Sequence, residues 1–111
     1  CFLYGGETTV AVSGHGKGGR NQHLALSAVA VMHKNNITML AAGTDGTDGP
    51  TDAAGAIADM QVIATMHDSM LDPTHYLENH DAYHFFEKVG ALLKTGATQT
   101  NVMDLVIGII N

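Results

Sequence analysis

The chain has 111 residues, of which 45% are hydrophobic and 14% charged, and this composition fits one small domain with a packed core. Eleven acidic residues against five basic ones give a formal net charge of −6, and Trp is absent, so neither a nucleic acid nor an anionic membrane is expected as a partner. The single cysteine excludes an internal disulfide framework and favours a reducing compartment, so a cytoplasmic location is expected.

The first half of the chain alternates predicted strands and a helix. Residues 8–13 (TTVAVS) are rich in β-branched side chains and predict a strand. Residues 20–33 are rich in Ala and Leu and apolar on more than one face, which is typical of a helix packed between layers. Residues 37–42 form a short apolar run that indicates a buried strand, and residues 53–58 fit either a strand or the start of a helix.

The second half is mainly helical until its last segment. Residues 60–70 predict a helix with Asp59 as its N-cap, and Pro73 opens a helical turn a few residues later. Asp81 is expected to cap a further helix over residues 82–93, whose aromatic side chains, Tyr83 among them, are expected in the core. A polar loop then leads into the final apolar run, LVIGII, which predicts a buried strand.

The order of these elements suggests the fold class. Strand, helix and strand make a βαβ unit, whose crossover connection gives parallel strands. We therefore expect an α/β fold with three layers, α/β/α, in which a mostly parallel or mixed sheet carries helices on both faces. Ligands of such sheets bind beyond the carboxyl ends of the strands, so the loops that begin at Gly14 and Gly43 are expected to share one edge.

The glycine-rich loop GHGKGGRN, residues 14–21, resembles two known phosphate-binding patterns. Its first six residues fit G-x-G-x-x-G, the dinucleotide fingerprint, although Asp45 lies 26 residues beyond Gly19 and the ribose-binding acid usually lies about 20 residues further on. The loop also approaches the P-loop pattern, but Arg20 and Asn21 replace its Lys and its Ser or Thr.

Both patterns depend on the same physical chemistry. Glycines allow backbone N–H groups to converge, and the start of the following helix carries partial positive charge, so an anion is stabilised there. Lys17 and Arg20 add two full positive charges, and Arg20 is the single arginine of the chain. The loop therefore favours a phosphate or carboxylate site over a pyrophosphate turn, while a tight turn with two solvated cations stays open as the alternative.

Two further polar segments carry candidate residues. Asp45, Asp48 and Asp52 lie in one glycine-rich loop after a predicted buried strand, where carboxylates can hold Mg²⁺ or act as general bases. The alternative is that these residues only build turns. Thr100 and Asn101, in the last loop, suit contacts with a phosphate or a sugar and equally suit ordinary loop capping.

Four segments together resemble one known family. In order, spacing and length, GGETTV, GKGGRNQ, AAGTDGTDGPTDAAGA and TNVMDL are similar to the successive motifs of the MOFRL domain, from about residue 5 to residue 105. This is the C-terminal domain of class II glycerate kinases, a family also described as hydroxypyruvate reductases. The chain departs from the family pattern at His80 and Ala82, at Ala97 and Gln99 of the last loop, and at His23, where the family often has Glu.

The resemblance implies that residues 1–111 form a single MOFRL-like domain, the C-terminal part of a longer two-domain chain whose Rossmann-like N-terminal domain is absent from this sequence. The implied enzyme is a glycerate 2-kinase that transfers the γ-phosphoryl group of ATP to D-glycerate, with Mg²⁺, in the cleft between the two domains. The isolated domain is expected to show no turnover. The implied partners are ATP, D-glycerate and the other domain, and the sequence allows a homodimer without predicting one.

The residues expected to act in this site fall into three groups. The catalytic candidates are Arg20, Lys17 and Asp45. The candidates for binding substrate or phosphate are Gly16, Gly18, Gly19, Asn21, Thr44, Asp52, Thr100 and Asn101. The metal candidates are Asp45 and Asp48. Two other functions stay open, an NAD(P)H-dependent hydroxypyruvate reductase and a non-catalytic anion-binding domain.

Overall fold

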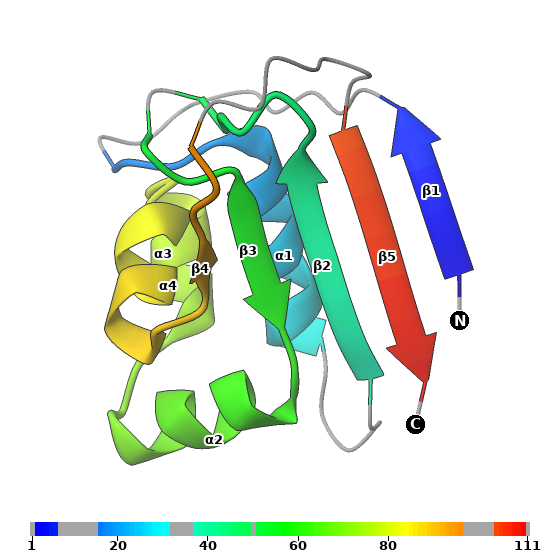
Figure 1. Ribbon diagram of the computed structural model, residues 1–111. Helices are drawn as coiled ribbons and strands as arrows, with labels where there is room; N and C mark the ends of the chain where they lie inside the picture. Colours follow the sequence, from blue (N-terminus) through cyan, green and yellow to red (C-terminus); the bar gives the residue numbers. More distant parts are fainter. Residues whose placement is uncertain (1, 7–15, 32–36, 50, 97–103, 111) are drawn as a thin grey trace.

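The described residues form a sheet of five strands in which every neighbouring pair is antiparallel (Figure 1). The computed structural model describes residues 2–6, 16–31, 37–49, 51–96 and 104–110. The strands are β1 (Phe2–Gly6), β2 (Ile37–Gly43), β3 (Gly55–Ala58), β4 (Leu92–Leu93) and β5 (Asp104–Ile110). Their order across the sheet is β1-β5-β2-β3-β4, so the strand that comes last in the chain lies between β1 and β2.

The α/β character is confirmed, but the expectation of a mostly parallel or mixed sheet is wrong, because every strand pair among the described residues is antiparallel. The chain leaves β2 and returns as the neighbouring β3 through a loop that contains no helix, and such a return makes the two strands antiparallel. β1 and β2 do run in the same direction, but β5 lies between them and pairs with both in the antiparallel sense. The order of strands along the chain could not reveal this insertion.

The helices gather on one side of the sheet. They are α1 (Arg20–Val31), α2 (Met60–Asp68), α3 (Pro73–Glu78) and α4 (Ala82–Val89). In Figure 1, α1, α3 and α4 lie behind the sheet, and α2 lies near the lower end of β3. Among the described residues the helices therefore add one layer to the sheet, and the predicted third layer is not seen. No helix of the described segments has both the length and the apolar character that crossing a membrane requires.

Most predicted elements are present. The helix expected from residue 20, the strand expected at residues 37–42 and the closing strand are confirmed as α1, β2 and β5. The ambiguous residues 53–58 contain a strand, β3. The strand predicted at residues 8–13 lies outside the described residues, whereas β1 was not predicted.

The helix boundaries follow from local capping. The Asp59 carboxylate accepts a hydrogen bond from the backbone N–H of Val62 at 2.8 Å, so the predicted N-cap of α2 is confirmed. Pro73 occupies the start of α3, as expected from its fixed φ and missing N–H. At the other end of this region, α4 stops at Gly90, which adopts the left-handed conformation with φ of 72°.

One expectation for α4 is wrong and one is confirmed in part. Because Gly90 ends the helix, Leu92 and Leu93 do not continue it but pair with β3 as the short strand β4. Asp81 does occupy the N-cap position of α4, but its side chain forms no capping hydrogen bond with the backbone of that helix. Its Oδ1 lies 2.6 Å from Nδ1 of His84 and also accepts a hydrogen bond from the N–H of Lys17 in the glycine loop.

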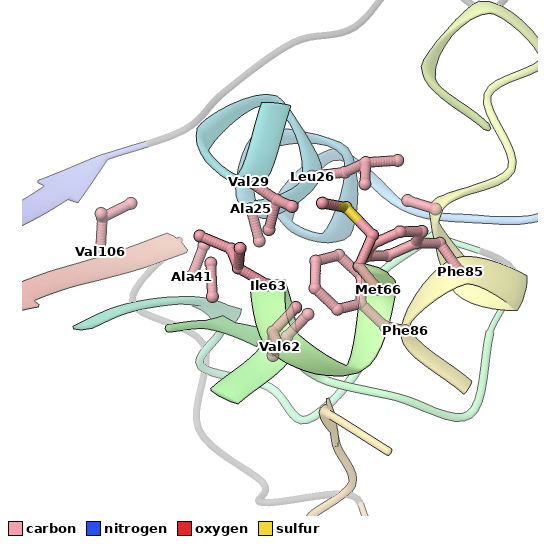
Figure 2. Packing of buried hydrophobic residues seen from close by; sticks show 13 residues of the cluster. Ala25, Leu26, Val29, Ala41, Val62, Ile63, Met66, Phe85, Phe86 and Val106 are labelled. Carbon is pink, nitrogen blue, oxygen red and sulfur yellow. The ribbon is translucent and has the colours of Figure 1, made fainter. Parts of the chain in front are cut away.

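The core lies between the sheet and the helices (Figure 2). Leu26 of α1 and Phe85 and Phe86 of α4 are fully buried in it. The strand residues that face α1 are small, and Ala41 and Ala56 have no exposed surface. Small side chains on β2 and β3 let α1 approach the sheet closely, which fixes where its first turn lies.

Loops from several elements meet at one end of the sheet. The end of β2, the starts of β3 and β5, and the first turn of α1 all lie at the upper edge in Figure 1. In the strand register Asp104, the first residue of β5, pairs with Gly6 on one side and Gly43 on the other. The expectation that the glycine-rich and aspartate-rich loops share an edge is therefore confirmed for their described parts.

Candidate functional site

Arg20 and Asp104 form an ion pair that joins α1 to β5. The Nε of Arg20 lies 2.6 Å from Oδ2 of Asp104, and its Nη2 lies 2.9 Å from Oδ1. The Asp104 side chain is 1% exposed, whereas that of Arg20 is 35% exposed. Two parallel hydrogen bonds fix the plane of the guanidinium group, because both of its bonded nitrogens must stay in line with the carboxylate.

Asp48 caps α1 from another segment of the chain. Its carboxylate is fully buried and accepts hydrogen bonds from the backbone N–H groups of Asn21, at 3.0 Å, and Gln22, at 2.8 Å. The first N–H groups of a helix lack partners within the helix, and a carboxylate there also meets the positive end of the helix dipole. Burial raises the pKa of Asp48, and the hydrogen bonds from Asn21 and Gln22 oppose that rise.

Asn21 links the two buried carboxylates. Its side-chain Nδ2 donates to Oδ1 of Asp48 at 3.2 Å and to Oδ1 of Asp104 at 3.0 Å. Both contacts need a donor, so the orientation of the amide is fixed. Its Oδ1 is buried and has no hydrogen-bond partner among the residues that the structure describes. The side-chain amide of Asn21, at the start of α1, thus bridges the carboxylates of Asp48 and Asp104.

The glycine loop packs on the junction between α3 and α4. The N–H of Gly16 donates to the carbonyl of Asn79 at 2.9 Å. The N–H of Lys17 donates to Oδ1 of Asp81 at 2.9 Å, and the carbonyl of Lys17 accepts from the N–H of Tyr83 at 2.9 Å. The backbone N–H and carbonyl of Lys17 are therefore both held at the start of α4, by Asp81 and by Tyr83.

Close approach explains two of the glycines. A Cβ atom added at Gly19 would lie 2.3 Å from Cγ of Asp48, and one added at Gly16 would lie 2.4 Å from Cβ of Asp81. Any larger residue at either position would push the glycine loop away from these aspartates. The backbone is thus brought against both acids by residues that have no side chain.

Lys17, Tyr83, Asp52 and Lys94 form a series of contacts, with a lysine at each end. The Nζ of Lys17 lies 4.1 Å from the centroid of the Tyr83 ring. The Tyr83 hydroxyl donates to Oδ1 of Asp52 at 2.7 Å, and Nζ of Lys94 lies 3.3 Å from the other oxygen of that carboxylate. The hydrogen bond from Tyr83 and the nearby Lys94 lower the pKa of Asp52, while their contacts with Asp52 raise the pKa of Tyr83 and of Lys94.

Two histidines stack beside the glycine loop. The rings of His23, on α1, and His80, before α4, are 4.8 Å apart at their centroids with an interplanar angle of 14°. The Nδ1 of His23 is buried and finds no hydrogen-bond partner in the described segments. Burial lowers the pKa of His23, and the nearby His80 lowers it further.

The remaining predicted residues are spread around this edge. Thr44 follows β2 directly, and the half-buried Asp45 accepts a hydrogen bond from the N–H of Thr47 at 3.0 Å. No group of three or more His, Cys, Asp or Glu side chains is placed to hold a metal ion in the part of the chain that the structure describes. Thr100 and Asn101 lie outside that part.

Comparison with known proteins identifies the family. A sequence model of the MOFRL family matches residues 1–104. The chain belongs to the MOFRL family. The resemblance seen in the four sequence motifs is therefore confirmed for nearly the whole domain.

The MOFRL domain is similar to parts of two kinases of known name. It is 54% identical over 111 residues to D-glycerate 2-kinase of Thermotoga maritima and 46% identical over 110 residues to glycerate 2-kinase of Pyrococcus horikoshii. The matches cover 99% and 98% of this chain but only 27% and 25% of the two relatives. The chain thus spans about a quarter of the length of these relatives.

Solved structures show the same fold. The crystal structure of the Thermotoga maritima glycerate kinase matches with a TM-score of 0.93 and 53% identity, covering 98% of this chain and 27% of that one. A Pyrococcus horikoshii structure matches with a TM-score of 0.92 and 45% identity, covering 98% of this chain and 25% of that one. The MOFRL domain is one portion of each longer protein.

Three contact residues of the MOFRL domain were not among the predicted site residues. Asp104 lies at the end of the polar loop that leads into the final apolar run, and an acid directly before a buried strand is a usable signal. The sequence predicts Asp81 only as a helix cap and Tyr83 only as a core residue. Tyr83 is indeed buried, but no pattern in the sequence shows that its ring meets Lys17 and its hydroxyl meets Asp52.

Proposed function

We propose that this MOFRL domain supplies one side of the active site of a glycerate 2-kinase, which transfers the γ-phosphoryl group of ATP to D-glycerate and forms 2-phosphoglycerate. The observation that carries the proposal is the 54% identity to the Thermotoga maritima D-glycerate 2-kinase along the whole domain. The geometry agrees with it, because two cations, Lys17 and Arg20, flank the start of a helix at the edge of the sheet where the loops meet.

Arg20 is proposed to stabilise negative charge on the transferred phosphoryl group. Phosphoryl transfer depends on positioning and on electrostatic stabilisation of charge that spreads over the phosphoryl oxygens. Asp104 holds the guanidinium group of Arg20 in one plane, and about a third of the Arg20 side chain remains accessible. An arginine held in this way does not have to be reoriented during the reaction.

The glycine loop is proposed to act with Lys17 at the same site. Gly16, Gly18 and Gly19 place the backbone close to Asp81, to Ala82 and to Asp48, respectively. These contacts support the shape of the loop, and Lys17 then provides the charge for an anionic group of the substrate. Asn21 is proposed to support Arg20 by holding Asp104, rather than to contact substrate itself.

Mg²⁺ would be held by Asp45 and by phosphate oxygens of the nucleotide. Mg²⁺ is commonly bound by one or two carboxylates together with substrate phosphates and water, so one suitably placed aspartate fits its chemistry. Asp45 is half-buried in the turn that follows β2. Its carboxylate is proposed to hold the ion or to orient the hydroxyl group of glycerate.

Asp48 fits this role less well. Both of its oxygens accept hydrogen bonds from the start of α1, and its side chain is fully buried. Coordination of a metal ion would have to break contacts that cap the helix. We therefore propose that Asp48 supports the start of α1 and is not a metal ligand.

The rest of the pocket is proposed to come from Thr44, Asp52, Thr100 and Asn101 and from an N-terminal domain that closes on this edge. This chain covers only 27% and 25% of the two kinase relatives, which supports a second domain in the full-length protein. The isolated MOFRL domain is then expected to lack turnover. A cytoplasmic location remains part of this proposal, supported by the single cysteine.

The kinase is favoured over the reductase and over a non-catalytic domain. The two relatives quoted above are both named as kinases. In addition, the glycine loop carries two cations, Lys17 and Arg20, and its glycines pack against aspartates. A dinucleotide-binding loop requires neither the cations nor the aspartates.

The direct test uses the full-length protein with ATP, Mg²⁺ and D-glycerate, followed by phosphorus NMR. A new phosphomonoester signal with matching ADP is expected, and its chemical shift assigns the 2- or 3-position. Arg20→Ala is expected to lower kcat by about 10²–10³. A parallel reaction with NADH and hydroxypyruvate tests the alternative, and steady NADH oxidation without a phosphomonoester would replace the kinase by a reductase.

A further inference from the structure

Tyr83 joins the glycine loop to the aspartate-rich loop. The face of its ring meets the ammonium group of Lys17, its backbone N–H donates to the Lys17 carbonyl, and its hydroxyl donates to Asp52. The residue is 6% exposed, so packing holds in place both the backbone N–H and the side chain that make these three contacts. A residue needed only to fill the core would not have to meet both loops.

The two cations of the glycine loop have different surroundings. The guanidinium group of Arg20 is paired with the buried carboxylate of Asp104 through two hydrogen bonds. The ammonium group of Lys17 lies on an aromatic ring, and no carboxylate of the described residues is within ion-pair distance of it. An aromatic face attracts a cation without neutralising it. Within the described part of the chain, no carboxylate therefore competes with an incoming anion for the ammonium group of Lys17.

The main chain of Lys17 is held as well. Its N–H is bonded to the Asp81 carboxylate and its carbonyl to the N–H of Tyr83. The start of α4 thus fixes the backbone of Lys17 and, through the Tyr83 ring, the position of its ammonium group. Few of the rotamers of a free lysine are compatible with both constraints, so less side-chain entropy is lost when an anion binds.

The orientation of the ring is fixed from its far end. The Tyr83 hydroxyl donates to Asp52 at 2.7 Å, and Lys94 pairs with the second oxygen of Asp52 at 3.3 Å. Lys94 therefore offsets the negative charge of Asp52, which would otherwise weaken the attraction of this edge for an anion.

We propose that Tyr83 is a positioning residue that holds the ammonium group of Lys17 ready for an oxyanion of the substrate, a phosphate or a carboxylate. This inference rests on the proposed kinase function only for the identity of the anion during turnover. That anion is either a phosphate of ATP or the carboxylate of D-glycerate, and separate KM values for the two substrates show which of them Lys17 binds.

A double-mutant cycle in the full-length protein tests the proposal. Tyr83→Leu is expected to raise the KM of one substrate up to about tenfold, since a tenfold change corresponds to about 1.4 kcal/mol and the cation–π contact of a partly buried lysine lies in that range. Lys17→Met should have at least that effect, and the double variant should be no worse than Lys17→Met. Equal effects of Tyr83→Leu with and without Lys17 would overturn the proposal, because a purely structural role does not depend on the lysine.

The chain offers a matched control. Tyr76 and Lys88 form a second tyrosine–lysine pair on α3 and α4, with Nζ of Lys88 3.0 Å from the Tyr76 hydroxyl and 5.6 Å from its ring centroid. This pair makes no contact with the glycine loop among the described residues. Tyr76→Leu is expected to leave both KM values unchanged. Tyr83→Phe keeps the ring and should stay within about threefold of wild type.

A binding measurement separates this proposal from the kinase proposal. Inorganic phosphate is titrated into the four full-length proteins of the cycle, and the ε-CH₂ resonances of Lys17 are followed by NMR. The ring current of Tyr83 should shift these resonances upfield in wild type, and phosphate should bind about tenfold more weakly to Tyr83→Leu. If the effects of Tyr83 and Lys17 on phosphate binding depend on each other but D-glycerate is not phosphorylated, the positioning role is supported and the kinase function is contradicted.

The remaining outcomes decide against the positioning role. Turnover with D-glycerate but additive effects in the cycle would keep the kinase and overturn Tyr83 as a positioning residue. Should Tyr83→Leu fail to fold, the wild-type resonances decide, because Lys17 signals that show no upfield shift and no response to phosphate would overturn the proposal.

Discussion

Arg20 and Asp104 are joined by two hydrogen bonds, of 2.6 and 2.9 Å, between the first residue of α1 and the first residue of β5. The pair lies 84 positions apart in the chain and fixes the helix to a central strand of the sheet. Since the Asp104 carboxylate is almost fully buried, Arg20 has a structural role as well as its proposed catalytic one.

The first prediction concerns this pair. Arg20→Met removes the guanidinium group that pairs with the buried Asp104 carboxylate, and we expect it to lower the free energy of unfolding by about 2–4 kcal/mol. Urea unfolding of the 111-residue chain measures the change. Arg20→Met/Asp104→Asn removes both charges and should recover more than half of the loss, because the Asn can still accept from Asn21. No recovery in the double variant would show that the loss does not come from the buried charge.

The second prediction concerns Asp48 as a capping residue. Asp48→Ala leaves the N–H groups of Asn21 and Gln22 buried without acceptors, so we expect a loss of about 2–4 kcal/mol in the free energy of unfolding. Asp59→Ala is the control, since Asp59 caps α2 through one N–H at a half-exposed site and should cost about 1 kcal/mol. Equal losses in the two variants would contradict the role given to the buried cap.

The third prediction separates close packing from backbone conformation. Gly19→Ala would place a methyl group 2.3 Å from Cγ of Asp48, so the loop or the helix must move, and we expect a loss of about 3 kcal/mol or more. Gly90→Ala meets no atom within 4 Å but must adopt a φ of 72°, which costs about 1 kcal/mol. Thermal unfolding of both variants is the measurement, and a milder effect at Gly19 than at Gly90 would refute the packing explanation.

Local sequence signals predicted the elements of the fold better than their arrangement. Capping at Asp59 and the apolar run of β2 depend on neighbouring residues, so they could be recognised in the sequence. The insertion of β5 between β1 and β2 depends on pairing between distant segments, which leaves no local trace. For that reason the sequence favours a mostly parallel or mixed sheet, although every pair among the described strands is antiparallel.

The site shows the same division. The motifs indicated that Arg20, Lys17 and Asp48 are important, and the structure places all three at one edge. Their partners could not be inferred, because the contacts of Asp104 and Tyr83 bridge segments that are far apart in the chain. The spacing of acids along a loop also does not distinguish a metal ligand from a carboxylate that caps a helix, as Asp48 shows.

The fourth prediction concerns the pH dependence of stability. The pKa of His23 is lowered in the folded chain by burial, and further by His80, whereas in the unfolded chain it is near its ordinary value of 6.5. The unfolded state therefore binds more protons than the folded state between these two pKa values. The contribution of neutral His23 to the free energy of unfolding is therefore fully present above about pH 6.5, and it is lost as the pH falls from there through the lowered pKa.

Urea unfolding at pH 7.5 and at pH 5.0 tests this expectation on wild type and on His23→Gln. The stability of wild type should fall more between the two pH values than that of His23→Gln, which has no imidazole to protonate at the stacked site. His67→Gln is the matched control, since His67 is exposed on α2, away from the stacked pair. If His23→Gln and wild type lose the same stability on acidification, protonation at this stack does not contribute to the pH dependence, and the buried Nδ1 of His23 then needs another explanation.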